Sequence, residues 1–355
     1  MNHTDNLLPL EYYLKLHANK KHEFPTNTAN YFDRYIQIKS YLGTNVYPHI
    51  GAGTSAEDGG VYTDHSIEHF NAVIKYLGKL LNIKEKELDE KTQIILTPYE
   101  TFVALVSILL HDAGNIFGRV NHEKKPFKIF QSMGDAICPD NFEALLIAKI
   151  AEVHGGKIEN QLGEKTNDTI TSLKEDDNYA GQQIRPRLIA ALVRFADEIC
   201  EDRTRAVTYV QKFGTLPKFS EIYHKYAASI SSVDVDIPSK RISLKIEVLI
   251  NDIMRTFGKG TSENIEDIYL IDEINLRLEK MFKELSYCKN FMFEACQVNK
   301  IRAEIIIYNN EMQKIENKIF ELDHTGYPSD TYTLSKHYPD WCGQLLVDKY
   351  KEQAS

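Results

Sequence analysis

The sequence predicts a mainly α-helical protein that ends in a smaller α+β region. Before residue 205, apolar residues recur at three- and four-residue spacing, as in helices that bury one face. After residue 206, stretches of alternating apolar and polar residues, typical of strands, flank a long amphipathic segment. With 355 residues the chain is long for one core. We therefore expect an N-terminal helical extension with a Gly-rich linker at 1–60, a helical domain at 61–205 and an α+β region at 206–355.

Composition and charge narrow the classes of function. The formal net charge is −9 and no run of basic residues occurs, which disfavours nucleic acid as a partner. The five cysteines include no C-x-x-C pair, so neither a disulfide framework nor a thiolate zinc site is indicated. The first residues lack the pattern of a signal peptide, and no apolar run approaches the length of a membrane span. We expect a cytoplasmic protein that has no membrane partner.

The first predicted helices carry one pair of histidines. Residues 1–45 are rich in tyrosine and read as helices that pack on the core, and the Gly-rich stretch 51–60 lacks the spacing of a nucleotide-binding loop. In the helix that follows, His65 and His69 are four residues apart and therefore share one face. Two imidazoles so placed can converge on one site, although scattered surface histidines are also ordinary.

The most apolar predicted helix runs from 97 to 114, TPYETFVALVSILLHDAG. Thr97, Pro98 and Glu100 form a capping box with proline at the first helical position. His111 and Asp112 stand at its end, where burial is costly unless both side chains are paired or bind a metal. The alternative is an ordinary helix cap that faces solvent.

Three further candidate residues, two histidines and an aspartate, follow the HDAG motif in the sequence. His122 lies in a short polar loop, and His154 ends an apolar helix, where the helix dipole alone also favours a histidine. The turn-rich stretch 157–183 is predicted to pass over the site, and residues 155–185, with four glycines, are predicted to close over a ligand as a lid. In the helix IRPRLIAALVRFADEIC, Asp197 lies in an apolar run, and Arg194 is close enough in sequence to pair with it on the surface.

The C-terminal region contains no cluster of chemically reactive residues. VDVDIPSKRISLKIEV predicts a hairpin, residues 262–287 a long amphipathic helix, and KIRAEIIIYN a further strand. Trp341 is interpreted as a packing anchor. Because one small sheet does not obviously cover the long helix, we expect this region to support a homo-oligomer or regulation. The alternative is simple packing of the helix on its own hairpin.

Taken together, the helices present histidines and carboxylates in the order His, His-Asp, His, Asp. Neutral imidazoles and carboxylates are ligands of divalent Mn, Fe, Co or Zn, and less so of Mg. The sequence therefore predicts a site for one or two divalent metal ions.

The same residues carry a resemblance to a known superfamily. His69 with Val73, the doublet His111-Asp112 and the stretch LVRFADEIC around Asp197 resemble the motifs of the HD superfamily of metal-dependent phosphohydrolases. The resemblance covers roughly residues 61–205 and implies an HD-type catalytic domain there. It implies His69, His111, Asp112 and Asp197 as metal ligands, with Asp112 also catalytic. The wording TDHSIEH, HDAGN and RFADEICEDR is most similar to bacterial HD effector-type domains of nucleotide-based conflict systems, which implies antiviral defence.

The resemblance assigns three further histidines. His65 matches the catalytic general acid of related cyclic-nucleotide phosphodiesterases, although His65 could instead be the ligand with His69 behind it. His122 and His154 resemble the additional histidines that bind a second metal in two-metal members. Asn115 stands where the HD-GYP subgroup has lysine, and no GYP triplet follows, so hydrolysis of cyclic di-GMP is not inferred.

We therefore expect a metal-dependent phosphohydrolase that cleaves a phosphoester or phosphoanhydride bond of a small nucleotide, either a nucleoside triphosphate or a nucleotide messenger. A nuclease and a non-catalytic nucleotide- or protein-binding module are the alternatives. The predicted phosphate-binding residues are basic residues near the motifs: Arg119, Lys124, Lys157, Arg187 and Arg203.

Overall fold

A computed structural model describes residues 7–26, 29–50, 67–84, 87–159, 163–201, 216–323 and 333–354. The chain divides into two compact units, and the first contains the described residues up to Cys200 together with Cys288–Gln297. The second contains the described residues of Glu201–Tyr287 and those from Val298 onward. The predicted fold class, mainly helical with a smaller α+β C-terminal region, is confirmed. The domain boundaries expected at residues 60 and 205 stay a prediction, and the Gly-rich stretch lies outside the described residues.

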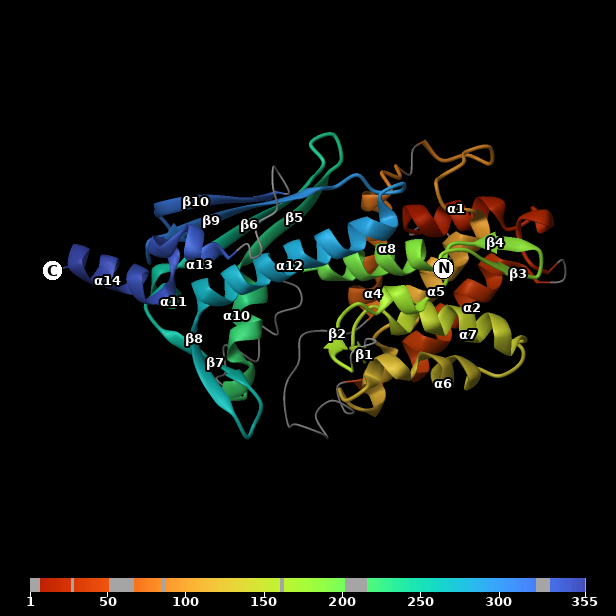
Figure 1. Ribbon diagram of the computed structural model, residues 1–355, viewed down its shortest axis with the longest axis horizontal. Helices are drawn as coiled ribbons and strands as arrows, with labels where there is room; N and C mark the ends of the chain where they lie inside the picture. The colour runs from red at the N-terminus through yellow and green to blue at the C-terminus, as the bar shows by residue number, and fades with distance from the viewer. Residues whose placement is uncertain are drawn as a thin grey trace. The chain divides into compact units, whose positions relative to one another are not determined.

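The first unit is helical, with two small hairpins between its last helices (Figure 1). Its α-helices are α1 (Pro9–His17), α2 (Tyr31–Asn45), α4 (Ile67–Leu80), α5 (Pro98–Leu110), α6 (Pro126–Gln131), α7 (Asn141–Glu152) and α8 (Pro186–Glu198). Short 3-10 helices are η1 (Lys21–Glu23), η3 (Ala113–Phe117), η4 (His122–Lys124) and η5 (Ile170–Ser172). The hairpins pair β1 (Ile158–Glu159) with β2 (Lys165–Thr166), and β3 (Asp177–Tyr179) with β4 (Gln182–Ile184).

Helix α5 is the centre of the first unit. Every residue of α5 is buried, and the helix packs against α1, α2, α4, α7 and α8. By length and composition the stretch Pro98–Phe117 could cross a membrane, which differs from the expectation that no apolar run is long enough. Of the apolar window in this stretch, 89% is buried inside the protein, as is usual for a core helix.

The start of α5 is tied to the start of α8. The predicted capping box is present: the Glu100 amide donates to Thr97 Oγ1 over 3.1 Å, and the Thr97 amide donates to Glu100 Oε2 over 2.9 Å. Glu100 is only 1% exposed. Arg185, the residue before α8, donates from Nε to Glu100 Oε1 over 2.9 Å and from Nη2 to Oε2 over 2.6 Å. This forked ion pair neutralises a carboxylate that would be costly to bury alone.

The second unit is built around a four-stranded sheet in the order β10-β9-β6-β5. β5 and β6 form the predicted hairpin, β9 and β10 form another, and β6 and β9 pair in parallel with Ile242 opposite Ile301. Alternate residues of β6 and β9 are buried, so one sheet face lies in the core. The strands and helices are η7 (Lys218–Ser220), α10 (Glu221–Ser229), β5 (Ile230–Asp236), β6 (Arg241–Leu249), α11 (Ile250–Ile253), β7 (Thr256–Gly260), β8 (Ile265–Tyr269), α12 (Leu270–Met292), β9 (Lys300–Tyr308), β10 (Lys314–Asp323), α13 (Leu334–His337), η8 (Pro339–Trp341) and α14 (Gly343–Ala354).

The prediction of one long helix at 262–287 is wrong for its first residues. Ile265–Tyr269 forms strand β8, which pairs with β7 in antiparallel register, and α12 begins only at Leu270 and continues to Met292. The isoleucines at 265 and 268 fit a helical stripe as well as a strand, so spacing alone could not decide. Pairing with β7, the neighbouring strand in the sequence, decides in favour of the strand.

The C-terminal segment is anchored on α12 by polar contacts. Asn275 donates to the backbone oxygen of Trp341 over 3.0 Å, and the Gly343 amide donates to Asp272 over 2.8 Å. Trp341 is 2% exposed and meets the ring of Phe320 edge to face. The interpretation of Trp341 as a packing anchor is therefore correct.

The Glu100–Arg185 pair yields a stability prediction. In Arg185→Met, Glu100 stays buried without its partner, and we expect the free energy of unfolding to fall by about 3 kcal/mol, since breaking a buried ion pair costs roughly 3–5 kcal/mol. The low end applies because 28% of the Arg185 side chain is exposed. Urea denaturation measures the change. The control is Lys84→Met, which removes an ion pair 63% and 66% exposed and should cost less than about 1 kcal/mol. Equal effects of the two variants would contradict the prediction.

Candidate metal centre

The HD doublet lies where α5 ends. His111 is the C-cap of α5, is fully buried, and donates from Nδ1 to the carbonyl oxygen of Ile108 over 2.7 Å. A carbonyl only accepts, so Nδ1 carries the hydrogen and Nε2 is left as the atom that can accept a metal. Asp112 follows as the N-cap of η3, with its side chain 10% exposed.

Three histidines of the centre are oriented in the same way. His111, His122 and His154 each donate from Nδ1 to the carbonyl oxygen three residues earlier, over 2.7, 2.8 and 2.6 Å. For His111 and His154 these carbonyls belong to the last turns of α5 and α7, which have few partners within their own helix. One hydrogen bond thus serves the helix end and also fixes the tautomer with Nε2 free for a ligand.

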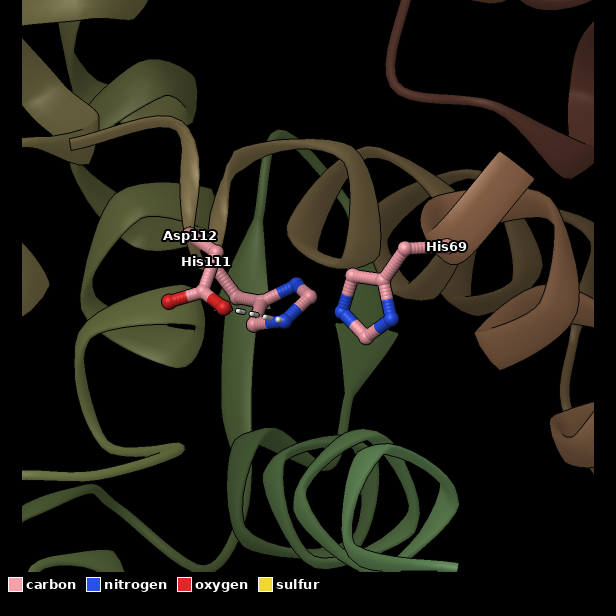
Figure 2. A group of neighbouring side chains, drawn as sticks. All are labelled: His69, His111 and Asp112. Carbon is pink, nitrogen blue, oxygen red and sulfur yellow. Dashed lines mark ion pairs between the residues drawn. The ribbon is translucent and has the colours of Figure 1, made fainter. Parts of the chain in front are cut away.

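Four predicted ligands form a first set. In Figure 2, His69 from α4 faces His111 and Asp112, and the ligand atoms of these three residues lie within 4.8 Å of one another. Asp197 from α8 completes the set: its Oδ1 is 3.4 Å from His69 Nε2 and 3.5 Å from His111 Nε2. Asp112 Oδ2 is 3.6 Å from His111 Nε2.

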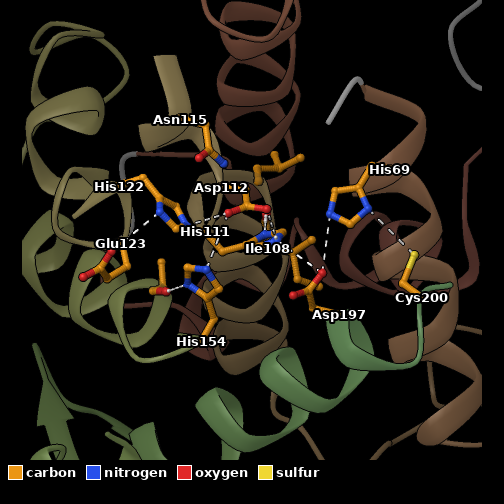
Figure 3. A network of polar contacts seen from close by, with 12 residues as sticks. His69, Ile108, His111, Asp112, Asn115, His122, Glu123, His154, Asp197 and Cys200 are labelled. Carbon is orange, nitrogen blue, oxygen red and sulfur yellow. Dashed lines mark hydrogen bonds and ion pairs between the residues drawn. The ribbon is translucent and has the colours of Figure 1, made fainter. Parts of the chain in front are cut away.

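Asp112 belongs to a second set as well. Its Oδ1 lies 3.0 Å from His122 Nε2 and 3.6 Å from His154 Nε2. Figure 3 shows His122 and His154 on one side of Asp112, and His69 and Asp197 on the other. The two carboxylate oxygens of one residue thus face two groups of donors, which lie on four helices and one turn.

The donors fit divalent metal ions. Imidazole nitrogens and carboxylate oxygens bind such ions at about 2.0–2.2 Å, so two ligands of one ion lie about 3.0–3.5 Å apart. The separations of 3.0–3.6 Å agree with this spacing. In the described part of the chain, Nε2 of His111 is buried and meets the geometry of a hydrogen bond with no group. A buried ring nitrogen without a hydrogen-bond partner suits a ligand that is absent from the chain itself.

The electrostatics of the centre favour positive charge. Burial opposes the charged form of His111, but the carboxylates of Asp112 and Asp197 outweigh burial and raise the pKa of His111 to about 9. Burial likewise opposes ionisation of Asp197, but His111 and His69 outweigh it and hold the pKa of Asp197 below its usual range. The pKa of His122 is raised because its contact with Asp112 exceeds the effect of burial.

The predicted phosphate-binding residues differ in their surroundings. Arg119 Nη1 lies 3.5 Å from Oδ1 of the buried Asn115, beside the HD doublet. Lys124 and Lys157 are exposed, two residues after His122 and three after His154. Arg187 instead donates to the backbone oxygens of Leu173 and Thr171. His65 and Arg203 lie outside the described residues.

Two contacts at the centre were not anticipated. Arg194 does not follow the suggested surface pairing with Asp197: it is 6% exposed and donates to Thr169, Asn167 and Val153. Cys200 Sγ lies 3.9 Å from His69 Nδ1, so Asp197 of α8 and Cys200 just after the helix contact the two nitrogens of that ring. Cys200 follows the C-cap Ile199, so helical periodicity gave no signal for this contact.

Gly114 in the HDAG motif brings η4 close to the doublet. A Cβ atom at residue 114 would lie 2.0 Å from the backbone oxygen of His122. We expect Gly114→Ala to displace His122, to lower the free energy of unfolding by about 1–3 kcal/mol as overpacking does, and to weaken metal binding by the set of Asp112, His122 and His154 roughly 10–100-fold, as loss of ligand support does. Calorimetric titration with Mn²⁺ measures the metal affinity, and urea denaturation measures the stability. Gly155→Ala is the control, because a Cβ there meets nothing within 4 Å. A metal affinity of Gly114→Ala equal to that of Gly155→Ala would contradict the prediction.

Comparison with known proteins gives the family. The family model HD-CE matches residues 60–280, more than half of the 355-residue chain. Neither a search of curated proteins nor a search of solved structures returns a match. An HD-type domain with two His/Asp ligand sets fits a metal-dependent hydrolase. The chain belongs to the HD-CE family of HD domains.

Proposed function

We propose that this protein is a metal-dependent phosphohydrolase that cleaves a phosphoester or phosphoanhydride bond of a small nucleotide. The observation that carries the proposal is Asp112, whose two oxygens face two separate sets of imidazoles. A carboxylate shared in this way suits a pair of divalent ions, Mn, Fe, Co or Zn by donor type, such as many phosphate-cleaving enzymes use.

Each ligand has a defined role in the proposal. His69, His111 and Asp197 would hold one ion, His122 and His154 would hold the other, and Asp112 would contribute a carboxylate oxygen to each. Divalent ions there would lower the pKa of a bound water and neutralise charge on a phosphoryl oxygen. The Nδ1 contacts of the histidines keep the donors oriented, so little reorganisation is needed during the reaction. His65 stays the proposed general acid on the basis of the resemblance.

The basic residues support a small substrate. Arg119, Lys124 and Lys157 follow the doublet, His122 and His154 closely in sequence, which suits contacts to a single phosphate group. Arg187 is the weaker candidate because backbone oxygens already occupy its guanidinium. A net charge of −9 disfavours long polyanions, whose binding depends on many Lys and Arg contacts.

Asp112 gives the first test. In Asp112→Ala both sets lose a ligand, so we expect metal content and hydrolysis to be lost together while helical content, followed by circular dichroism, stays close to that of the wild type. Elemental analysis of protein purified without chelator measures the metal. Asp135→Ala, which removes an exposed carboxylate of the same unit, is the control. The enzyme proposal fails if the wild type holds no transition metal and gains no activity with Mn²⁺ or Co²⁺.

A substrate screen gives the second test. With Mn²⁺ present, we expect turnover of one class among deoxynucleoside triphosphates, nucleoside triphosphates, cyclic mono- or dinucleotides and ppGpp, read by chromatography, and none of single-stranded oligonucleotides. Degradation of the oligonucleotides alone would replace the proposal with a nuclease. Binding of a nucleotide without turnover by the metal-loaded chain would favour a non-catalytic module.

Two wider expectations accompany the proposal. The resemblance to conflict-system domains supports a role in antiviral defence, which a comparison of phage plating on cells with the wild type and with Asp112→Ala tests. Homo-oligomer formation through the C-terminal region also stays a prediction. Light scattering of the intact chain at micromolar concentration decides it.

A further inference from the structure

Arg194 is a buried arginine on α8, the helix that carries Asp197. It lies one turn before Asp197, and only 6% of it is exposed. A buried guanidinium is costly unless acceptors satisfy its five N–H groups. Asp197 contacts His69 and His111 of the first set. The acceptors of Arg194 show which other residues the same turn of α8 binds.

The contacts of Arg194 lead to the end of α7. Its Nη1 donates to Thr169 Oγ1 over 2.8 Å, to the Asn167 oxygen over 3.1 Å and to the Val153 oxygen over 3.4 Å. Thr169 Oγ1 in turn donates to the same Val153 oxygen over 2.8 Å. The polarity is consistent, since the hydroxyl accepts from the guanidinium and passes its own hydrogen to the carbonyl.

Val153 is the residue immediately before His154, and it is the C-cap of α7. Its oxygen receives Thr169 and Arg194, while the His154 ring donates to the oxygen of Ala151. The turn that presents His154 is therefore fixed by hydrogen bonds at the oxygens of both Ala151 and Val153. One of the donors to Val153, Arg194, lies on α8, the helix that carries Asp197.

We propose that Arg194 and Thr169 form a clamp that fixes His154 relative to Asp197 and so sets the affinity for the second divalent ion. The inference rests on the proposed two-ion centre. Both are positioning residues: they act through the Val153 carbonyl and touch no ligand atom in the contacts above. Loss of the clamp frees the His154 turn and leaves the first set, which does not include His154, intact.

Thr169→Val is the sharpest variant because it keeps the shape of the side chain and removes only the hydroxyl relay. We expect it to bind the first Mn²⁺ as the wild type does and the second roughly 10–100-fold more weakly, as is typical when support of a metal ligand is lost. Arg194→Lys, which keeps the charge but removes the guanidinium with its Nη1 donor, should act in the same direction. Thr171→Val is the matched control, since Thr171 donates to the Asp168 oxygen at an exposed position.

The readouts separate positioning from stability. Calorimetric titration gives the two affinities, the electron paramagnetic resonance signal of a coupled manganese pair reports the second ion, and thermal unfolding of the metal-free proteins reports fold stability. Excess Mn²⁺ should restore both the coupled signal and turnover in Thr169→Val. Second-ion affinity equal to that of Thr171→Val would overturn the clamp and leave the proposed function standing. A wild type that binds one ion or none would overturn the clamp together with the two-ion centre.

Discussion

Two polar contacts fix the register between α5 and α8, and the centre depends on that register. Glu100 and Arg185 pair at the starts of the two helices, and His111 and Asp197 meet at their ends. The contacts are eleven residues apart on α5 and twelve on α8, or about 17 and 18 Å at a rise of about 1.5 Å per residue. A slip of one helical turn, about 5.4 Å, would separate both pairs at once.

Helix α7 repeats this arrangement. Glu143 lies in its first turn, is 2% exposed, and pairs with Arg34 of α2 over 2.8 Å, and His154 follows eleven residues later. At the starts of α5 and α7 each buried carboxylate forms an ion pair with an arginine, at distances of 2.6 and 2.8 Å. At the ends, most contacts between histidines and carboxylates are longer, 3.4–3.6 Å. Buried carboxylates at the helix starts are thus neutralised by close ion pairs, whereas at the helix ends the longer separations match those of two ligands of one cation.

The sequence predicted the elements whose signals are local. The capping box at Thr97, the hairpin of β5 and β6, and the ligand-type residues at helix ends follow from spacing and turn chemistry within a few residues. Strand β8 was missed because the spacing of Ile265 and Ile268 fits a helix as well as a strand, and the hairpin with the preceding strand β7 was not recognised. The partners of Arg194 could not be predicted. Spacing allows a pair with Asp197, but a buried guanidinium takes the several acceptors that tertiary packing brings to it.

The segment expected to close over the site as a lid is held in place where the structure describes it. Arg187 and Arg194, two turns apart on α8, bind oxygens of Leu173, Thr171 and Asn167. Between these anchors Thr169 is 3% exposed and bonds to the end of α7. Moving this segment away would break five hydrogen bonds, each contributing about 0.5–1.5 kcal/mol, and would leave the buried Arg194 without two of its acceptors. Residues 167–173 are therefore held against the end of α7 and against α8, and the closure of the longer stretch as a lid stays a prediction.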